Sequence, residues 1–94
     1  MGLIERAIRE IESKIGYSYD RRIVESVVAE GLVSGDVIDL GVTAGEHMIA
    51  TVSVNTVTIK HKGKETVVAI SDLTEAQADR MIINKAIRAS RKSY

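Results

Sequence analysis

Residues 48–59 read MIATVSVNTVTI, a stretch without a charged side chain in which apolar residues alternate with small polar ones. Alternation with a period of two is typical of a β-strand that buries one face. The phase of the alternation changes after Asn55-Thr56. Asn suits the positive φ that a two-residue hairpin turn requires, so this change predicts a turn at Asn55-Thr56 between two antiparallel strands.

The same period continues on both sides of this hairpin. A second turn at 62–65 and a loop over 43–47 predict four strands in an antiparallel meander that starts at Val37. The predicted register pairs Val54 with Val57, Val52 with Ile59, Ile59 with Val68, Leu40 with Ala50 and Ile38 with Val52. These residues would then share one buried face.

Helical periodicity flanks the predicted sheet. Isoleucines at 4, 8, 11 and 15 form the stripe of an amphipathic helix that ends at Gly16. Asp20 can cap a second helix that runs to Gly31, and Thr74 with Gln77 forms a capping box for a third helix that reaches about Ser90. The sequence therefore predicts a single α+β domain over residues 1–94, in the order α-α-β-β-β-β-α. Its predicted core contains Ile8, Ile11, Val52, Val54, Val57, Ile59 and Ile82.

Composition excludes several classes of protein. The chain has 94 residues, 13 basic and 13 acidic side chains and no cysteine. Its charges are too evenly balanced for a disordered chain, and without cysteine it forms no disulfide bond. No apolar run is long enough to span a membrane and the start lacks a signal-peptide pattern, so we expect a cytoplasmic protein. One Gln and two Asn are a lean count of thermolabile residues, as in thermophile proteins, although the absence of proline points the other way.

No motif for catalysis or metal binding is present. The two histidines have no ligand-spaced partner, and the glycines of residues 41–46 lack the lysine of a phosphate-binding loop. No serine lies in a nucleophile elbow. We therefore expect no enzymatic activity, no metal and no cofactor.

The charges are distributed unevenly along the chain. Residues 23–59 carry five acidic and no basic side chains, whereas residues 60–94 carry eight basic and four acidic ones. On the third predicted helix one side collects the basic residues Arg80, Lys85, Arg88, Arg91 and Lys92. This stripe could bind phosphates or an acidic partner surface, or it could be a solvated face whose cations complement the helix dipole.

Tyr17, Tyr19, Arg21 and Arg22 form the one aromatic and basic cluster. Such a group can stack a base and hold its phosphate, and the tyrosines can equally cover the core between two helices. The segment around it resembles a winged-helix DNA-binding unit, with Gly16-Tyr17-Ser18 and Glu30-Gly31-Leu32-Val33 at the turn and at the step into the wing. The resemblance implies DNA binding, but the acidic residues 23–59 would repel a phosphate backbone.

The outer face of the predicted sheet supplies the leading hypothesis. Its apolar and small polar residues include Val37, Ile49, Thr51, Val67 and Ala69. Only Asp39 and Lys60 are charged on this face, and residues 48–59 carry no charge on either face. Such an uncharged β-prone segment is an aggregation liability unless something covers it. The sequence therefore predicts a small non-enzymatic interaction module that forms a homo-oligomer or docks on a protein partner. The alternative is a nucleic-acid-binding protein that uses the Tyr17–Arg22 cluster and the basic helix.

Overall fold

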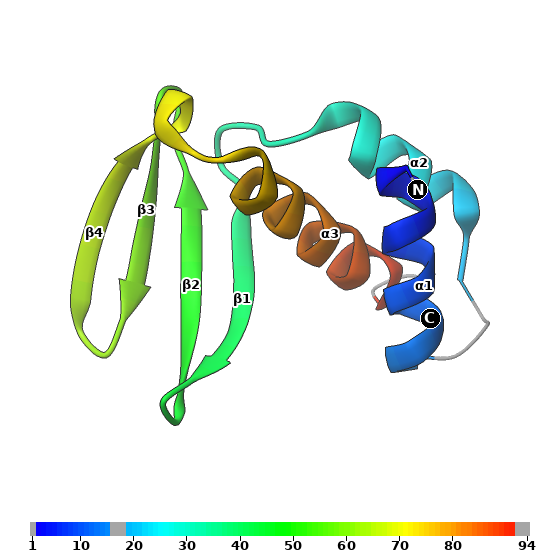
Figure 1. The fold of residues 1–94 in the computed structure, drawn as a ribbon, viewed down its shortest axis with the longest axis horizontal. Coiled ribbons are helices and arrows are strands. Elements are labelled where there is room, and N and C mark those ends of the chain that lie inside the picture. The colour runs from blue at the N-terminus through cyan, green and yellow to red at the C-terminus, as the bar shows by residue number, and fades with distance from the viewer. Residues whose placement is uncertain (1, 16–18, 92–94) are drawn as a thin grey trace. The chain divides into compact units, whose positions relative to one another are not determined.

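The computed structural model describes residues 2–15 and 19–91. The chain has an α+β fold with the element order α-α-β-β-β-β-α, as the sequence predicts (Figure 1). Its residues group into two compact units. We call Met1–Gly31 together with Ile82–Tyr94 the helical unit, and Leu32–Met81 the sheet unit.

The helical unit contains α1 (Leu3–Ile15), α2 (Arg21–Glu30) and the later turns of α3 (Glu75–Arg91). The predicted start of α2 is confirmed, because the Asp20 carboxylate accepts a hydrogen bond from the backbone N–H of Arg22 at 2.9 Å. Its predicted end is also confirmed. Gly31, with a φ of +70°, donates its N–H to the carbonyl of Val27.

All three helices contribute to the core of the helical unit. Its buried members are Ala7, Ile8 and Ile11 of α1, Val24 of α2, and Ile83, Ala86 and Ile87 of α3. The α1 residues recur at intervals of three and four, which places them on one side of that helix. Ile8 and Ile11 are therefore buried as predicted.

Four strands make the sheet unit, in the spatial order β1-β2-β3-β4. They are β1 (Val37–Thr43), β2 (Glu46–Val52), β3 (Thr56–His61) and β4 (Lys64–Ala69). Two of the connections are two-residue turns, Ala44-Gly45 and Lys62-Gly63, in which both residues have positive φ. That conformation matches the twist of the paired strands, and glycine adopts it without steric cost at the second position.

The register differs from the prediction by two residues in each hairpin. Val52 pairs with Val57, Ala50 with Ile59, Val57 with Val68, and Ile38 with Ala50. The turns account for the difference: the turn at Lys62-Gly63 is shorter than the four residues predicted. The β2–β3 connection covers residues 53–55 and is closed by a hydrogen bond from Ser53 N–H to the Thr56 carbonyl. Because side chains alternate with a period of two, a shift of two leaves the residues within the strands on their predicted faces.

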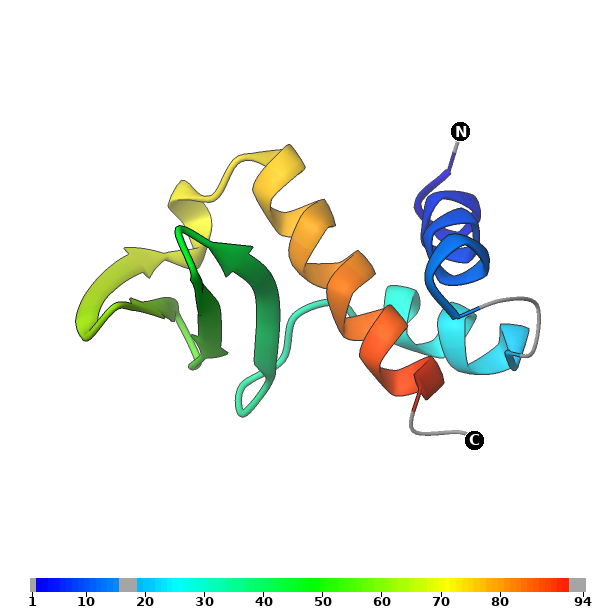
Figure 2. The same cartoon turned by 90° about the horizontal axis from the view of Figure 1, so that it is seen from below.

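The inner face of the sheet packs against η1 (Ile70–Asp72) and the first turns of α3, which lie on one side of the twisted sheet (Figure 2). Its buried residues are Ile38, Ala50, Val52, Val57 and Met81. The predicted capping box at the start of α3 is confirmed. The Thr74 N–H donates to Gln77 Oε1 at 2.9 Å, and the Gln77 N–H donates to Thr74 Oγ1 at 3.1 Å.

The predicted burial is wrong for Val54 and only partly right for Ile59 and Ile82. Val54 lies in the β2–β3 connection and is 78% exposed, because the strand ends two residues earlier than predicted. Ile59 is half-buried. Ile82 is also half-buried, and its neighbours Met81 and Ile83 are buried instead, one in each core.

Ser90 of α3 is fully buried, and its hydroxyl has no hydrogen-bond partner within residues 2–15 and 19–91. A buried hydroxyl without a partner costs about 1–3 kcal/mol of desolvation. We expect Ser90→Ala to raise the free energy of urea unfolding by about 1 kcal/mol. The exposed Ser26 of α2 is the matched control, since Ser26→Ala changes only helix propensity. A loss of stability in Ser90→Ala would mean that the hydroxyl has a partner.

Candidate functional site

The outer face of the sheet carries one uncharged row of side chains across all four strands. Val37 pairs with Thr51, Thr51 with Thr58, and Thr58 with Val67. We call these four residues the Val-Thr row. Each paired position in an antiparallel sheet brings side chains about 5 Å apart, so the row is a continuous surface.

Both ends of the Val-Thr row face solvent. Val37 is 61% exposed and Val67 is 63% exposed. The neighbouring outer-face positions Ile49 and Ala69 are half-buried, and Thr51 is exposed. The structure thus brings together all five residues that the sequence predicts for an oligomer face, since the two-residue shift in register does not change faces.

Charged side chains lie at one end of this face. Next to the Val-Thr row runs a second row, Asp39, Ile49, Lys60 and Glu65, in which Lys60 and Glu65 form an ion pair at 3.2 Å. The Asp39 carboxylate lies 3.0 Å from Nδ1 of His47 and also accepts a hydrogen bond from the Gly41 N–H. On the other side of the Val-Thr row, Thr56 pairs with Ala69 and neither residue is charged.

His61 does not lie opposite Ala50 as the predicted register requires. It pairs with Lys64, and its Nε2 lies 2.7 Å from the Thr43 carbonyl at the far end of the sheet. Within the described residues no three His, Cys, Asp or Glu side chains gather as a metal site would require.

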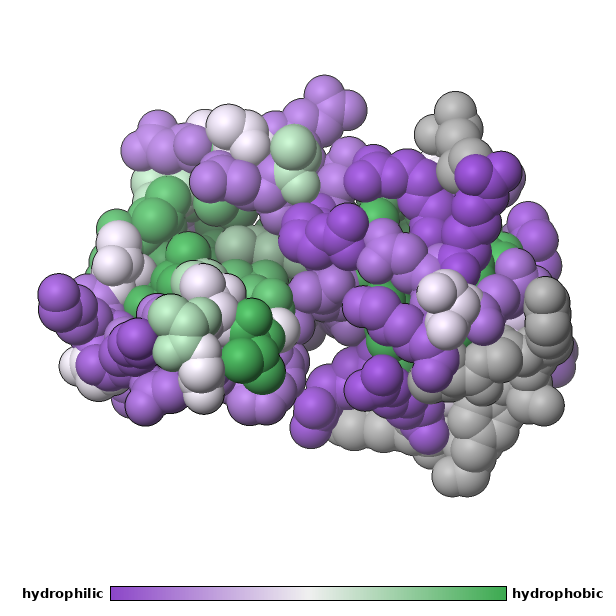
Figure 3. Space-filling model, turned by 60° about the horizontal axis from the view of Figure 1, so that its bottom comes forward, coloured by the Kyte–Doolittle hydropathy of each residue, from purple (hydrophilic) through white to green (hydrophobic). Residues whose placement is uncertain are grey.

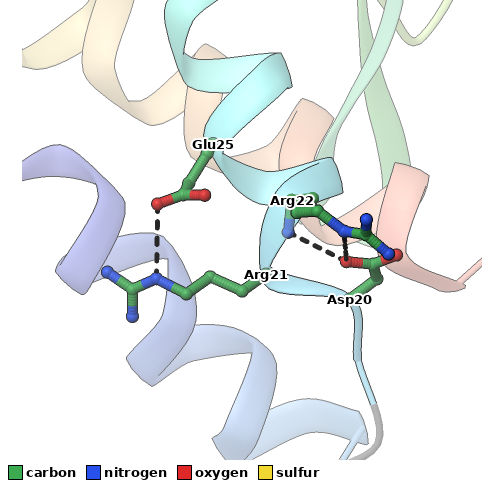
Figure 4. Close-up of polar contacts among 4 residues, drawn as sticks. All are labelled: Asp20, Arg21, Arg22 and Glu25. Atoms are coloured by element: carbon green, nitrogen blue, oxygen red, sulfur yellow. Dashed lines mark hydrogen bonds and ion pairs between the residues drawn. The ribbon is translucent and has the colours of Figure 1, made fainter.

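The basic residues of the Tyr17–Arg22 cluster are paired within the helical unit. Arg21 Nε lies 3.4 Å from Glu25, and Arg22 Nε lies 3.6 Å from the Asp20 carboxylate that caps α2 (Figure 4). The Tyr19 hydroxyl donates to Glu12 at 3.4 Å. Tyr17 lies outside the described residues. The carboxylates next to both arginines offset their positive charge and so lower the affinity of this cluster for phosphate.

The predicted basic stripe of the third helix is broken at Lys85. Its side chain is only 15% exposed, and its Nζ donates to Glu30 at 2.6 Å and to the Gly31 carbonyl at 2.8 Å. A cation there complements the negative C-terminal end of α2, so Lys85 joins α3 to α2 within the helical unit. Arg88 and Arg91 are exposed, Arg80 is exposed in the sheet unit, and Lys92 lies outside the described residues.

The inner face of the sheet unit holds a groove that the sequence reasoning missed. Its lining residues on and before α3, namely Leu73, Ala76, Gln77, Arg80 and Met81, recur at intervals of three and four. That recurrence is a signal that the sequence contains. It could not reveal the groove without the position of α3 over the sheet.

Comparison of the chain with models of protein families, with curated proteins and with solved structures finds no match. No helix in the described part of the chain combines the length and the apolar character that crossing a membrane demands.

Proposed function

We propose that the chain is a small non-enzymatic interaction module that self-associates through the outer face of its sheet. The observation that carries the proposal is the Val-Thr row, which crosses all four strands without a charge and ends in two valines that are each more than half exposed. Exposed apolar surface of this kind typically marks an interface or an aggregation site. A second copy of the chain offers the same surface in return.

The charge pattern around the row favours a particular symmetry. In a face-to-face dimer with its two-fold axis along the Val-Thr row, each row residue would lie against its own counterpart. Lys60 would then approach Thr56 of the other copy, and Glu65 would approach Ala69, so no like charges meet. A two-fold axis parallel to the strands would instead bring Asp39 toward Glu65 of the other copy, which is unfavourable.

The size of the face limits the strength of this dimer. Four strands about 4.8 Å apart, each giving about five residues at about 3.4 Å, make a face of about 320 Å² per copy. Stable complexes bury about 800 Å² per partner. We therefore propose a weak, reversible dimer whose population depends on protein concentration.

Nucleic-acid binding has less support than self-association, because several of the basic residues it would use lie beside carboxylates of the same chain. Arg21, Arg22 and Lys85 each have a carboxylate within 4.0 Å, so phosphate binding would have to break those pairs. We expect no measurable affinity for random-sequence DNA or RNA at about 0.15 M salt, where the Debye length is about 8 Å. Tight binding that Arg88→Glu with Arg91→Glu abolishes would establish the alternative function and overturn the proposal.

The variant Thr51→Lys tests the outer face directly. It places a charge at the centre of the Val-Thr row, where a dimer would bury that charge without a partner at a cost of about 3–5 kcal/mol. We expect Thr51→Lys to remain a monomer in sedimentation equilibrium at concentrations where the unmodified chain associates. Thr51 is exposed, so the chain itself should fold normally.

Thr66→Lys is the matched control for this experiment. Thr66 is an exposed strand threonine that pairs with Ile59 and therefore lies on the opposite face of the sheet. Its replacement should leave self-association unchanged. Equal association in both variants, or its loss in both, would contradict an interface on the outer face.

A further inference from the structure

The inner face of the sheet unit contains an apolar groove of about 370 Å³. Its wall comes from residues 73–81, and its floor takes one residue from each strand, namely Leu40, Met48, Ile59 and Val68. Figure 3 shows a hollow of hydrophobic surface in this part of the molecule, surrounded by hydrophilic residues. Pockets of about 300–1,000 Å³ with apolar walls and a few polar groups are typical of sites for small molecules.

The groove exists because one helix cannot cover the whole inner face. The two outer strands lie about 14 Å apart, at about 4.8 Å per strand, whereas a helix with its side chains is about 10 Å wide. Met81 of α3 is buried with residues from three strands, but all four floor residues are only half-buried. A small apolar molecule in the groove would remove this remaining apolar surface from water, which is favourable.

Two of the described lining residues have polar side chains, and they differ in what they offer to a ligand. Arg80 already has an interaction of its own within the chain, so an anion would have to compete with it. Gln77 Oε1 accepts from the Thr74 N–H at 2.9 Å, which fixes the amide and leaves its NH₂ group as the donor to a ligand. Gln77 is exposed, so this donor lies where the groove meets solvent.

We propose that the groove binds an uncharged aliphatic molecule with one carbonyl group. The alkyl chain lies against the floor, and the carbonyl oxygen accepts a hydrogen bond from the Gln77 amide. A charged head group would lose hydration in the groove without gaining an opposite charge that is still available, which is unfavourable. The proposal goes beyond self-association, since it concerns the opposite face of the sheet from the Val-Thr row and does not depend on a dimer.

A titration of the full chain with 2-octanone, followed by backbone amide chemical shifts, tests the class of ligand. The largest shifts are expected at the floor residues. Each methylene that leaves water should raise the affinity roughly fourfold, so 2-octanone should bind more tightly than 2-hexanone by that factor for each of the added methylenes. Octanoate and octyltrimethylammonium should each bind at least about tenfold more weakly than 2-octanone, because their charged groups find no such partner.

The variant Gln77→Glu isolates the amide donor. Glutamate can replace glutamine in a capping box, so the start of α3 should be kept while the NH₂ group is lost. We expect the affinity for 2-octanone to fall about fivefold, as the loss of one neutral hydrogen bond predicts. Ser26→Glu, which adds the same charge at an exposed position of α2, is the control and should leave the affinity unchanged.

The variant Ala76→Trp tests the place of binding. Ala76 lines the groove and is exposed, so a large side chain there should block the groove without disturbing a core. We expect it to abolish the binding of 2-octanone. Ala29→Trp, at an exposed position of α2, is its control.

Several results would overturn the proposal. Equal affinity for 2-octanone and octanoate would mean that the groove does not select a neutral ligand, and full affinity in Gln77→Glu would mean that the amide plays no part. Binding that survives Ala76→Trp would place the ligand elsewhere. Floor amide shifts that change with protein concentration in the absence of ligand would show that a second copy occupies the groove. The proposed function fails only if the chain does not associate, and that outcome leaves the 2-octanone titration unaffected.

Discussion

Replacing Ile83 by alanine is expected to lower the free energy of unfolding of the helical unit by about 2–5 kcal/mol. Ile83 is fully buried in the core that α1, α2 and the later turns of α3 share. The loss combines the transfer free energy of the removed methyl and methylene groups with the cavity left behind. Urea unfolding, together with hydrogen exchange of the α1 and α2 amides, measures it.

The neighbouring residue is the control. Ile82 is half-buried, so Ile82→Ala removes the same atoms from a position that is partly in water, and we expect less than half the loss. The sequence pattern alone assigns Ile82 to the core. If Ile82→Ala proved the more destabilising of the two, the helix would present the side that the pattern predicts and not the side in the structure.

The second large effect is expected at Val57 in the sheet unit. Val57 is fully buried between its strand partners Val52 and Val68, and Val57→Ala should lower the free energy of unfolding by about 2–3 kcal/mol. Val54 is a valine three residues away that the sequence also assigns to the core, but it is exposed. Val54→Ala should change stability by less than about 0.5 kcal/mol, and equal losses in the two variants would support the predicted register.

Local signals predicted the order of the elements and the helix ends that capping residues mark. The Asp20 cap, the capping box of Thr74 with Gln77 and the end of α2 at Gly31 each depend on residues within four positions of one another. The pairing of strands depends on the lengths of turns. The pattern indicated the alternation correctly, but it could not choose between a two-residue turn and a four-residue turn.

The phase of α3 could not be predicted for a different reason. Met81 is buried in the sheet unit, whereas Ile83 and Ile87 are buried in the helical unit. The apolar side of α3 therefore changes along the helix. A search for one continuous apolar stripe assumes a single direction, and it selects Ile82, which lies between the two buried positions Met81 and Ile83. The contact of Lys85 with Glu30 spans 55 residues, so no local pattern could have indicated it.

The candidate outer face was predictable because its residues depend only on the alternation. Val37, Thr51 and Val67 would share a face in the predicted register and share it in the observed one. The groove on the inner face was not predictable, since its wall comes from α3 and its floor from four strands.

The molar mass of the unmodified chain, measured by sedimentation equilibrium over a range of protein and salt concentrations, tests self-association most directly. The Val-Thr row carries no charge, so salt should not weaken the association. We predict that the mass rises with protein concentration from 10.2 kDa toward twice that value, at low and at high salt alike. A mass that stays at 10.2 kDa up to about 1 mM, which corresponds to an association free energy weaker than about −4 kcal/mol, would contradict the proposal.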